Sequence, residues 1–266
     1  MKISVIIPMY NASLSIRKCL YSVLNQTFAG ELEVIVVNDG STDKSLDIVN
    51  NIIDNQLKEN ISITIINQKN SGVSKARNVG MMQSTGKLIA LLDSDDEWLP
   101  RKIERQVEIL NDNNLIDFLG CSRNNENLKI LGKEISTLHK ASVNELLIKV
   151  YPQTSTAIFK RELFEKFGGY NEQMTHGEDA NLWVRYCANS NFYYSPESLV
   201  FTGDGKPSFG HSGLSANLKA MQRGSELTLK EARLNRLISL PFYYAVYAFS
   251  KVKYIRRIII TSLRKI

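Results

Sequence analysis

Short apolar runs alternate with amphipathic stretches through the first hundred residues, and this alternation most limits the possible folds. The apolar runs, which are rich in β-branched residues, are 3–7, 33–37, 61–66 and 88–92. The amphipathic stretches are 13–25, 44–55 and 73–84. A repeated strand–helix–strand pattern places parallel strands in one sheet with helices on both faces. The sequence therefore predicts an α/β fold with a mainly parallel sheet.

Beyond residue 98 the pattern is less regular and predicts a second set of elements. A helix is expected at 99–111 with Pro100 in its first turn, where proline is tolerated. The other expected segments are strands at 116–121 and 156–159, a polar hairpin or loop at 124–132, and helices at 142–150, 162–167 and 180–188. Residues 202–215 hold four Gly and one Pro, which predicts a long loop that serves as a lid or binding segment.

Charge is distributed unevenly along the chain. The formal net charge is +6, yet residues 232–266 contain eight basic and no acidic side chains. The first 231 residues therefore carry a net charge of −2. A nucleic-acid-binding surface needs basic side chains spread over a folded face, so we expect no nucleic-acid partner.

The cysteine pattern indicates the compartment. Cys19, Cys121 and Cys187 are far apart and form no CxxC motif. This argues against a disulfide scaffold and a thiolate zinc site, and it favours a reducing environment. The opening MKISVIIPMYN has one Lys and an apolar run too short for the core of a secretory signal. We therefore expect a cytoplasmic protein whose first residues form a strand.

The basic tail has two parts of different character. Residues 237–250 are uncharged and contain Pro241, but a bilayer span needs about 20 residues. Beyond them, one helical face is apolar and another is basic. The apolar face comprises Val252, Ile255, Ile259, Leu263 and Ile266, and the basic face Lys253, Arg256, Arg257 and Arg264. Residues 241–266 are thus predicted to contact a membrane surface; the alternative is a helix that packs on the body or mediates self-association.

Polar residues follow each of the four early strands. They occupy the segments 8–11, 38–41, 67–70 and 93–96. In an open α/β sheet, ligands bind beyond the carboxyl ends of the strands. The sequence therefore places its candidate site at this edge of the sheet.

Three carboxylates, Asp93, Asp95 and Asp96, follow the apolar run LIALL. Like charges this close repel one another unless a cation or strong donors lie nearby. Carboxylate oxygens suit Mg²⁺ or Mn²⁺, which in turn bind diphosphate oxygens. We therefore predict a metal–diphosphate site here, with Asp96 instead capping the helix that follows.

Other polar residues at this edge have both a structural and a binding interpretation. Asp39 can accept the imide N–H of uracil or cap the next helix through the turn DGST, and both roles can hold together. Tyr10 can pack against a base or lie at the edge of the core. Lys75 and Arg77 fall near a predicted helix N-terminus, where they can attract a phosphate or form a solvated face.

The pair Glu178 and Asp179 precedes the predicted helix 180–188. A carboxylate at such a turn can act as a general base toward a hydroxyl group or as an N-cap. His211, in the Gly-rich loop, can be a metal ligand or an ordinary loop residue. The glycine fingerprint of dinucleotide sites, the phosphate-loop motif and the GxSxG elbow do not occur, so those chemistries are disfavoured.

Taken together, these motifs resemble the family 2 glycosyltransferases with the GT-A fold. The matching segments, in the family's order, are SVIIPMYN (4–11), VVNDGSTD (36–43), NSGVSKARNVG (70–80), LLDSDDEW (91–98), FEKFGGYNE (164–172) and GEDANLWVR (177–185). They cover most of residues 1–190, and the match weakens after Tyr193. The resemblance implies a Rossmann-like GT-A sheet, mixed and mainly parallel, flanked by helices and followed by a helical tail.

The resemblance also implies roles for single residues. The donor-binding set would be Pro8, Tyr10, Asn11, Asp39, Lys75, Arg77, Asp93 and Ser94, with Pro8, Tyr10 and Asp39 around the uracil and Arg77 nearby. Asp95 would ligate Mn²⁺ or Mg²⁺ on the diphosphate, with Asp93 and His211 as further metal candidates. Asp179 would be the base that deprotonates the acceptor hydroxyl, supported by Glu178, and Trp183 would form an apolar wall behind their helix.

The implied activity is an inverting, metal-dependent hexosyl transfer. The donor would be a nucleotide sugar, UDP-linked, and the acceptor a hydroxyl of a glycan or lipid-linked saccharide in bacterial surface polysaccharide or lipooligosaccharide synthesis. Residues 1–98 would bind the donor and residues 99–231 the acceptor. The basic tail, 232–266, would hold the enzyme at the inner face of the cell membrane.

Two other functions are compatible with these residues. A sugar-phosphate nucleotidylyltransferase would need a Gly-rich basic loop after the first strand, where this chain has PMYNAS. A non-catalytic sugar-binding module could use the same scaffold, although it would have no need of both acidic motifs. The donor sugar, the acceptor, the linkage and the oligomeric state do not follow from the sequence.

Overall fold

The computed structural model describes residues 1–56, 58–203 and 216–263. Its centre is a nine-stranded sheet in the order β3, β2, β1, β4, β10, β6, β11 and β5, with β9 beside β11. These strands are β1 (Lys2–Met9), β2 (Glu31–Asn38), β3 (Ile61–Asn67), β4 (Leu88–Leu91), β5 (Glu97–Trp98), β6 (Phe118–Arg123), β9 (His139–Lys140), β10 (Ile158–Lys160) and β11 (Phe192–Phe201). A separate hairpin pairs β7 (Lys129–Ile130) with β8 (Lys133–Glu134).

The sheet has a parallel part and a mixed part. β3, β2, β1 and β4 all run parallel to one another. β10 runs antiparallel to β4 and β6, whereas β6 and β11 are parallel. β5 and β9 pair with β11 in the antiparallel sense. The mixed, mainly parallel sheet that the sequence predicted is confirmed.

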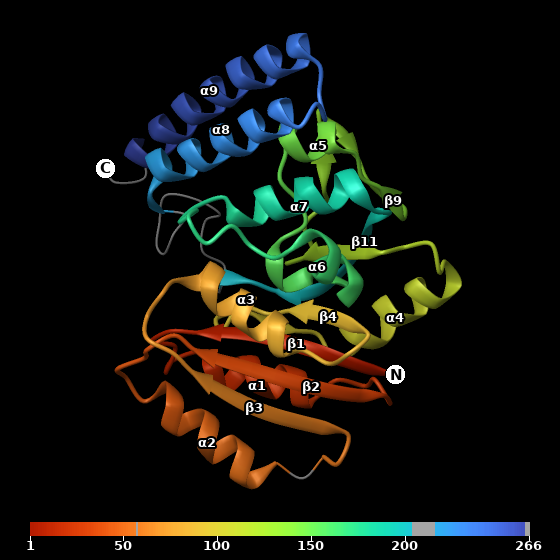
Figure 1. The fold of residues 1–266 in the computed structure, drawn as a ribbon, viewed down its shortest axis with the longest axis vertical. Coiled ribbons are helices and arrows are strands. Elements are labelled where there is room, and N and C mark those ends of the chain that lie inside the picture. The colour runs from red at the N-terminus through yellow and green to blue at the C-terminus, as the bar shows by residue number, and fades with distance from the viewer. Residues whose placement is uncertain (57, 204–215, 264–266) are drawn as a thin grey trace.

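Helices cover both faces of the sheet (Figure 1). Successive residues of a strand point to opposite faces, and in β1 both sets are apolar, so each face needs a layer of helices to bury it. Val5 and Ile7 of β1 share one core with α1 (Ile16–Leu24), α2 (Ser45–Asn55) and α4 (Lys102–Asp112). Ile6, between them, belongs to a second core on the opposite face. That core also contains residues of α3 (Val73–Gln83), α5 (Val143–Ile148), α6 (Arg161–Phe167) and α7 (Glu178–Asn189).

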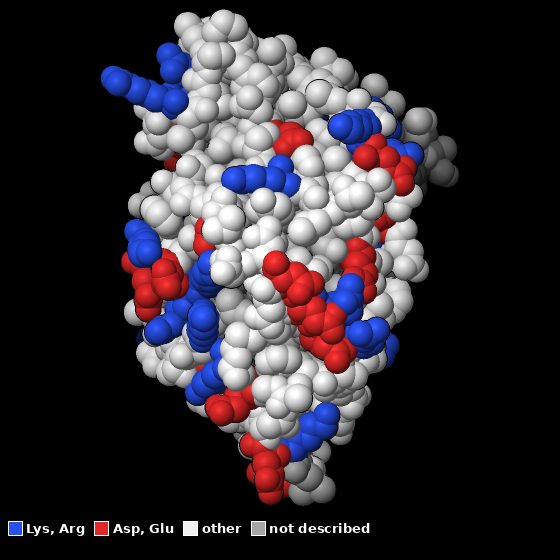
Figure 2. All heavy atoms as spheres, turned by 90° about the vertical axis from the view of Figure 1, so that its right-hand side faces the viewer, with Lys and Arg blue, Asp and Glu red and all other residues white. Residues whose placement is uncertain are grey.

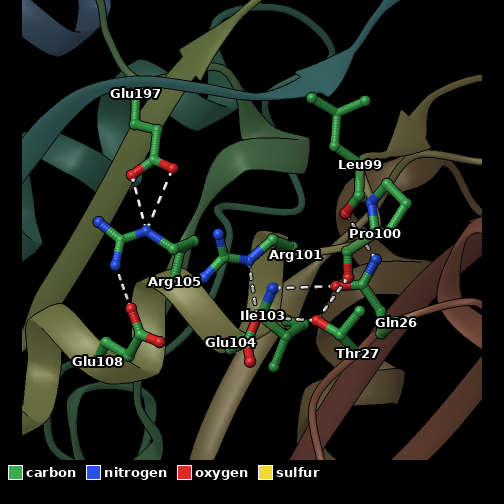
Figure 3. A network of polar contacts seen from close by, with 10 residues as sticks. All are labelled: Gln26, Thr27, Leu99, Pro100, Arg101, Ile103, Glu104, Arg105, Glu108 and Glu197. Atoms are coloured by element: carbon green, nitrogen blue, oxygen red, sulfur yellow. Dashed lines mark hydrogen bonds and ion pairs between the residues drawn. The ribbon is translucent and has the colours of Figure 1, made fainter.

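Polar contacts fix α4 against its neighbours (Figure 3). The Gln26 side chain accepts a hydrogen bond from the Ile103 amide and donates one to the Leu99 carbonyl. Two residues further along α4, Arg105 contacts both Glu197 of β11 and Glu108. These contacts hold the first half of α4 against the end of α1 on one side and β11 on the other.

Two long helices close the fold at the end of the molecule opposite α2 (Figure 1). α8 (Leu218–Leu234) packs against α7 and against α9 (Leu240–Leu263). Pro241 lies in the first turn of α9 and does not interrupt it, because a proline there removes no intrahelical hydrogen bond. Val246 of α9 is buried, and Phe242, Tyr243 and Tyr247 pack against the core. The part of the tail nearest to α8 thus belongs to the folded body.

The second half of α9 presents apolar side chains outward. Val252, Ile255, Ile259 and Leu263 are each more than half exposed. Lys253 instead turns toward the body, where its ammonium donates a hydrogen bond to the Ile148 carbonyl at 2.8 Å. Among the described residues, no helix combines the length and apolar character needed to cross a membrane.

Most elements predicted from the sequence are present within about three residues. Four elements were not predicted: the long strand β11, the helix α8, and the two-residue strands β5 and β9. Two local expectations were wrong. Thr156, expected to begin a strand, ends the 3₁₀ helix Thr154–Thr156 before β10, and Glu178 and Asp179 form the first turn of α7 instead of preceding it.

Charges on the side of the molecule that carries α4 are mixed. Figure 2, which turns the right-hand side of Figure 1 toward the viewer, shows acidic and basic side chains interspersed there, with few of either near the top. That face therefore presents no continuous field of one sign.

Candidate active site

The carboxyl ends of β1, β2 and β4 meet at one edge of the sheet, since these strands are parallel neighbours. Pro8 is buried within β1, and Tyr10 just beyond it is 51% exposed. The chain turns at Asn11, which has a φ of 48° and accepts a hydrogen bond from the Thr42 amide. This contact joins the turn after β1 to the turn after β2. The predicted donor-binding segments therefore lie side by side, and their contact with a nucleotide stays a prediction.

Asp39 organises the loop that leads into α3. The residue is 3% exposed, and its carboxylate accepts hydrogen bonds from Gln68 Nε2 at 2.7 Å and from the amides of Ser71 and Gly72 at 2.8 and 2.9 Å. Gly72 has a φ of +90°, which favours glycine. The expectation that Asp39 caps the next helix was wrong. The N-cap of α2 is Lys44, and the nearby Asp43 carboxylate accepts a hydrogen bond from the Ser45 amide at 2.9 Å.

Arg77 of α3 connects the two acidic segments. Its guanidinium lies 2.6 Å from Asp93 Oδ1 and 3.2 Å from Glu178 Oε1, and it stacks 4.9 Å from the centre of the Tyr170 ring. Burial alone would lower the pKa of Arg77, but Asp93, Tyr170 and Glu178 outweigh it and raise that pKa. Arg77 is 5% exposed, so it lies behind the site, and its placement beside a nucleotide stays a prediction.

Lys75, two residues earlier on the same helix, is the more accessible of the two basic residues. Its side chain is 43% exposed and lies 3.2 Å from Glu172. The helix therefore carries one buried arginine that organises carboxylates and one accessible lysine. Lys75 as a phosphate contact stays a prediction.

The turn after β4 holds three carboxylates in different surroundings. Asp96 is 4% exposed and accepts hydrogen bonds from Ser155 Oγ at 2.5 Å, Gln153 Nε2 at 2.9 Å and the Gly203 amide at 3.2 Å. Burial, and after it the charge of Asp93, raises the pKa of Asp96 to about 7. Asp96 therefore anchors a loop and the end of β11, and the expectation that it caps the following helix was wrong.

Asp93 and Asp95 are the carboxylates of this turn that face outward. Asp93 is half-buried, with one oxygen on Arg77, and Asp95 is exposed, with Ser94 between them. Among the described residues, no group of three or more His, Cys, Asp or Glu side chains surrounds a point where a metal could sit. Mg²⁺ commonly takes only one or two protein carboxylates and completes its shell with phosphate oxygens and water. The hard oxygens of Asp93 and Asp95 fit that arrangement, whereas His211 lies outside the described residues.

Glu178 and Asp179 begin α7 after Gly177, whose φ is +72°. Burial, and after it the charge of Glu178, raises the pKa of Asp179 to about 6. Glu178 accepts a hydrogen bond from Arg77, whereas the Asp179 carboxylate accepts one from the neighbouring Ala180 amide. Among the described residues, Asp179 is therefore the member of the pair that no cation contacts. A partly buried carboxyl with a pKa near neutrality suits proton transfer.

A close approach of α8 positions this turn. A Cβ added to Gly224 would lie 2.1 Å from the His176 carbonyl oxygen, which no side chain could tolerate. Gly224 therefore lets α8 pack directly beside the segment that carries the acidic pair. The sequence did not predict this contact, because a glycine within a helical pattern ordinarily argues against a stable helix there.

Trp183 of α7 anchors that helix in the core. It is fully buried, its ring lies 4.7 Å from that of Phe118, and its indole N–H donates to the Pro152 carbonyl at 3.0 Å. This position fits the apolar wall predicted for it. The helix that carries Asp179 is thus held by an aromatic core on one side and by α8 on the other.

A cavity of about 490 Å³ opens beside Asp179. Its wall combines the start of α7 with the end of α5, the inner faces of α8 and α9, and the end of β6. Four basic residues line it: Arg123, Lys149, Lys253 and Arg257. The sequence did not reveal this cavity, although the i, i+4 spacing of Lys253 and Arg257 in a tail without acidic residues was a signal for a shared basic face.

Comparison with known proteins identifies the family. Residues 4–168 match the family model described as glycosyl transferase family 2. The chain belongs to this family. The match includes the turns after β1, β2 and β4 and ends before Gly177, so the acidic pair of this family 2 chain lies beyond it.

A curated relative and two solved structures give the context. The chain is 31% identical over 189 residues to the Escherichia coli UDP-Glc:alpha-D-GlcNAc-diphosphoundecaprenol beta-1,3-glucosyltransferase WfgD, covering 71% of each protein. S. aureus TarS 1-349 in complex with UDP-GlcNAc has a TM-score of 0.71 at 22% identity, covering 97% of this chain and 72% of that one. The Pyrobaculum calidifontis mannosyltransferase PcManGT, in complex with GDP-Man and Mn²⁺, has a TM-score of 0.62 at 18% identity, covering 98% and 86%.

These likenesses show the fold and the family. The two structures establish that the chain has the GT-A fold. The chain spans only 26%, 53% and 59% of the lengths of three other curated relatives, described as uncharacterized glycosyltransferases from Rickettsia bellii, Nostoc and Haemophilus influenzae.

Proposed function

We propose that this chain is an inverting glycosyltransferase that moves a sugar from a UDP-sugar to a hydroxyl group of a lipid-linked saccharide. One observation carries the proposal. Arg77 contacts Asp93 and Glu178 together, so the acidic turn of the donor side and the acidic pair beside the cavity face one site. Carboxylates 85 positions apart in the sequence (93 and 178) converge there only through the fold.

The reaction we assign is a single displacement. The acceptor oxygen forms a bond to the anomeric carbon while the bond from that carbon to the diphosphate oxygen breaks, and the acceptor proton goes to Asp179. The raised pKa of Asp179, about 6, leaves its carboxylate ionised at neutral pH and basic enough to take the proton. Direct attack from the face opposite the leaving group inverts the anomeric centre, and positioning supplies much of the rate.

On the donor side, the residues around the strand ends have distinct tasks. Tyr10 and Asp39 flank the place proposed for uracil, since one offers an exposed ring and the other a carboxylate already fixed by three donors. Asp95 and Asp93 would hold Mg²⁺ or Mn²⁺ against the diphosphate. The bound cation would stabilise the negative charge of the leaving diphosphate. PcManGT, with its GDP-Man and Mn²⁺, supports this assignment.

The acceptor is proposed from the cavity and from the named relative. WfgD acts, by its name, on a saccharide attached to diphosphoundecaprenol. In this chain, the exposed apolar residues of α9 would contact the membrane in which such a lipid lies. We therefore place the enzyme at the inner face of the cell membrane, in the synthesis of surface polysaccharide or lipooligosaccharide.

The test is a pair of measurements on the purified chain. A panel of UDP-sugars, each added with Mn²⁺, is scored by thermal shift, because a ligand that binds the native state raises its stability. The UDP-sugar with the largest shift is then incubated with a GlcNAc-diphosphate lipid. Release of UDP with formation of a disaccharide lipid supports the proposal.

The same assay separates the alternatives. A sugar-phosphate nucleotidylyltransferase would form a UDP-sugar from UTP and a sugar phosphate and release pyrophosphate. A sugar-binding module would show a thermal shift and no product with any acceptor. Either result would contradict the proposed function.

A further inference from the structure

Four basic residues and two acidic ones line the described part of the cavity beside Asp179. Its basic lining residues come from three elements: Arg123 from β6, Lys149 from the end of α5, and Lys253 and Arg257 from α9. The acidic side chains on the same wall are Glu126 and Asp179. Glu126 lies 3.8 Å from Arg123, so that basic residue already has an anionic partner.

Three further basic residues of the lining form a group that we call the basic triad: Lys149, Lys253 and Arg257. Among the described residues, no ion pair within 4.0 Å involves Lys149 or Lys253. Their ammonium groups donate instead to backbone carbonyls, Lys149 to Lys129 at 3.0 Å and Lys253 to Ile148 at 2.8 Å. Each ammonium has three donor hydrogens, so both retain capacity to bind a ligand.

Electrostatics within the triad favours an anion. Burial, and after it the charges of Arg257 and Lys149, lowers the pKa of Lys253 to about 8. Burial also lowers the pKa of Lys149 and of Arg257. Cations held this close in a partly desolvated wall repel one another, and a bound anion would relieve that repulsion.

The remainder of the cavity indicates what the anion is attached to. Asp179 lies on the same wall, so a ligand held by the triad can present a hydroxyl group to the base. Apolar side chains also line the cavity, among them Leu147, Ile148, Val150 and Met221. The volume of about 490 Å³ is of the size that holds a small organic ligand.

We propose that Lys149, Lys253 and Arg257 bind the phosphate or diphosphate group of the acceptor, with the acceptor's sugar directed toward Asp179. The assignment rests on the proposed function and names the chemical class of its acceptor: a saccharide joined through phosphate to an apolar chain. It also gives the two faces of α9 separate tasks. The inward cations hold the acceptor's phosphate, and the outward apolar residues lie against the membrane that contains its lipid.

The test measures the affinity of the full chain for octyl diphosphate by calorimetry. The chain is first saturated with UDP and Mn²⁺, so that the proposed donor site is already filled. The variant Lys253→Gln/Arg257→Gln removes two triad charges and keeps polar groups of similar reach. Its control, Lys251→Gln/Arg256→Gln, removes two charges from the same helix at positions that do not line the cavity. Octyl glucoside, which has no phosphate, is titrated in parallel.

We expect the triad variant to bind octyl diphosphate about a hundredfold more weakly, since each hydrogen bond between charged groups contributes roughly a factor of ten. The control should stay within about threefold of the unmodified chain, and octyl glucoside binding should not separate the two variants. Lys149→Gln, a change on a different element, should weaken octyl diphosphate about tenfold. UDP affinity and melting temperature report whether each variant is folded.

Three results would overturn the proposal. Equal losses in the triad variant and the control would show a general effect of charge. Unchanged octyl diphosphate binding in the triad variant and in Lys149→Gln would show that the triad binds no phosphate. Loss of sedimentation with phosphatidylglycerol vesicles in the triad variant but not in the control, without loss of octyl diphosphate binding, would assign the triad to lipid headgroups. If the unmodified chain does not bind UDP, that result would instead contradict the proposed function.

Discussion

The two sides of the candidate site are built in different ways. On the donor side, carboxylates at the ends of parallel strands are fixed by backbone amides and neighbouring side chains, as Asp39 and Asp96 show. On the cavity side, the charged groups are long cations from separate elements, held to backbone carbonyls. The contacts therefore fix the proposed donor side closely, whereas the proposed acceptor side depends on long side chains from separate elements.

A substitution at Asp179 should separate the two sides most clearly, because it should reduce transfer and leave UDP binding intact. Asp179→Asn keeps the size of the side chain but removes its ability to accept a proton, so transfer should fall by about 10²- to 10⁴-fold. UDP binding in the presence of Mn²⁺ should be unchanged, because it depends on the other side. Steady-state turnover and calorimetry measure the two quantities.

The control for that change is Asp112→Asn, an exposed carboxylate at the end of α4. It should leave turnover and UDP binding unaltered. Full turnover by Asp179→Asn would refute its assignment as the base.

The connection between the two sides depends on Arg77. Arg77→Gln would leave Asp93 and Glu178 as buried or half-buried carboxylates without their cation, and loss of one member of a buried ion pair costs about 3–5 kcal/mol of stability. Urea unfolding measures this loss. Arg105→Gln, whose ion pairs are more exposed, should cost less than about 1 kcal/mol, and similar losses in the two variants would contradict the role of Arg77.

A smaller effect is expected from Asp95, which we propose acts on the donor side through a bound cation. Asp95→Ala should weaken UDP binding about tenfold with Mn²⁺ present and leave it unchanged in EDTA, because the carboxylate acts through the metal. The matched control is Asp54→Ala, an exposed carboxylate on α2. An equal loss with and without Mn²⁺ would show that Asp95 does not bind the metal.

The smallest effect concerns the outward face of α9. Ile255→Ser/Ile259→Ser should lower sedimentation with phosphatidylglycerol vesicles several-fold, since both side chains are more than half exposed and would lose their apolar contact with the bilayer. Thermal stability should stay the same. Leu14→Ser, at a 97% exposed position far from this helix, is the control, and equal vesicle binding by all three proteins would argue against membrane contact.

The donor side could be predicted from the sequence because its elements are local. Each early strand is followed at once by its helix, and the polar residues between them fall at the strand ends. The roles of Asp39 and Arg77 could not be predicted in the same way. Asp39 holds a loop about 30 residues away, and Arg77 meets Glu178 across 101 residues, so neither contact leaves a local pattern.

The cavity side was harder for physical reasons. β11 contains Pro196 and a register shift between Ser195 and Ser198, which disrupt the alternation typical of a strand. α8 contains Gly224, which weakens a helix pattern but permits the close contact with His176. Residues 204–215 of the predicted loop, including His211, lie outside the described residues.

The most direct test of the central claim, that Asp179 is the base of a site shared by both sides, is the pH profile of transfer. Because a general base must be ionised, kcat/KM should fall as pH drops through about 6, the raised pKa of Asp179, with a slope of one proton. UDP binding should stay level over the same range. A kcat/KM that stays constant from about pH 5 to about pH 8, where such a base must titrate, would contradict the assignment.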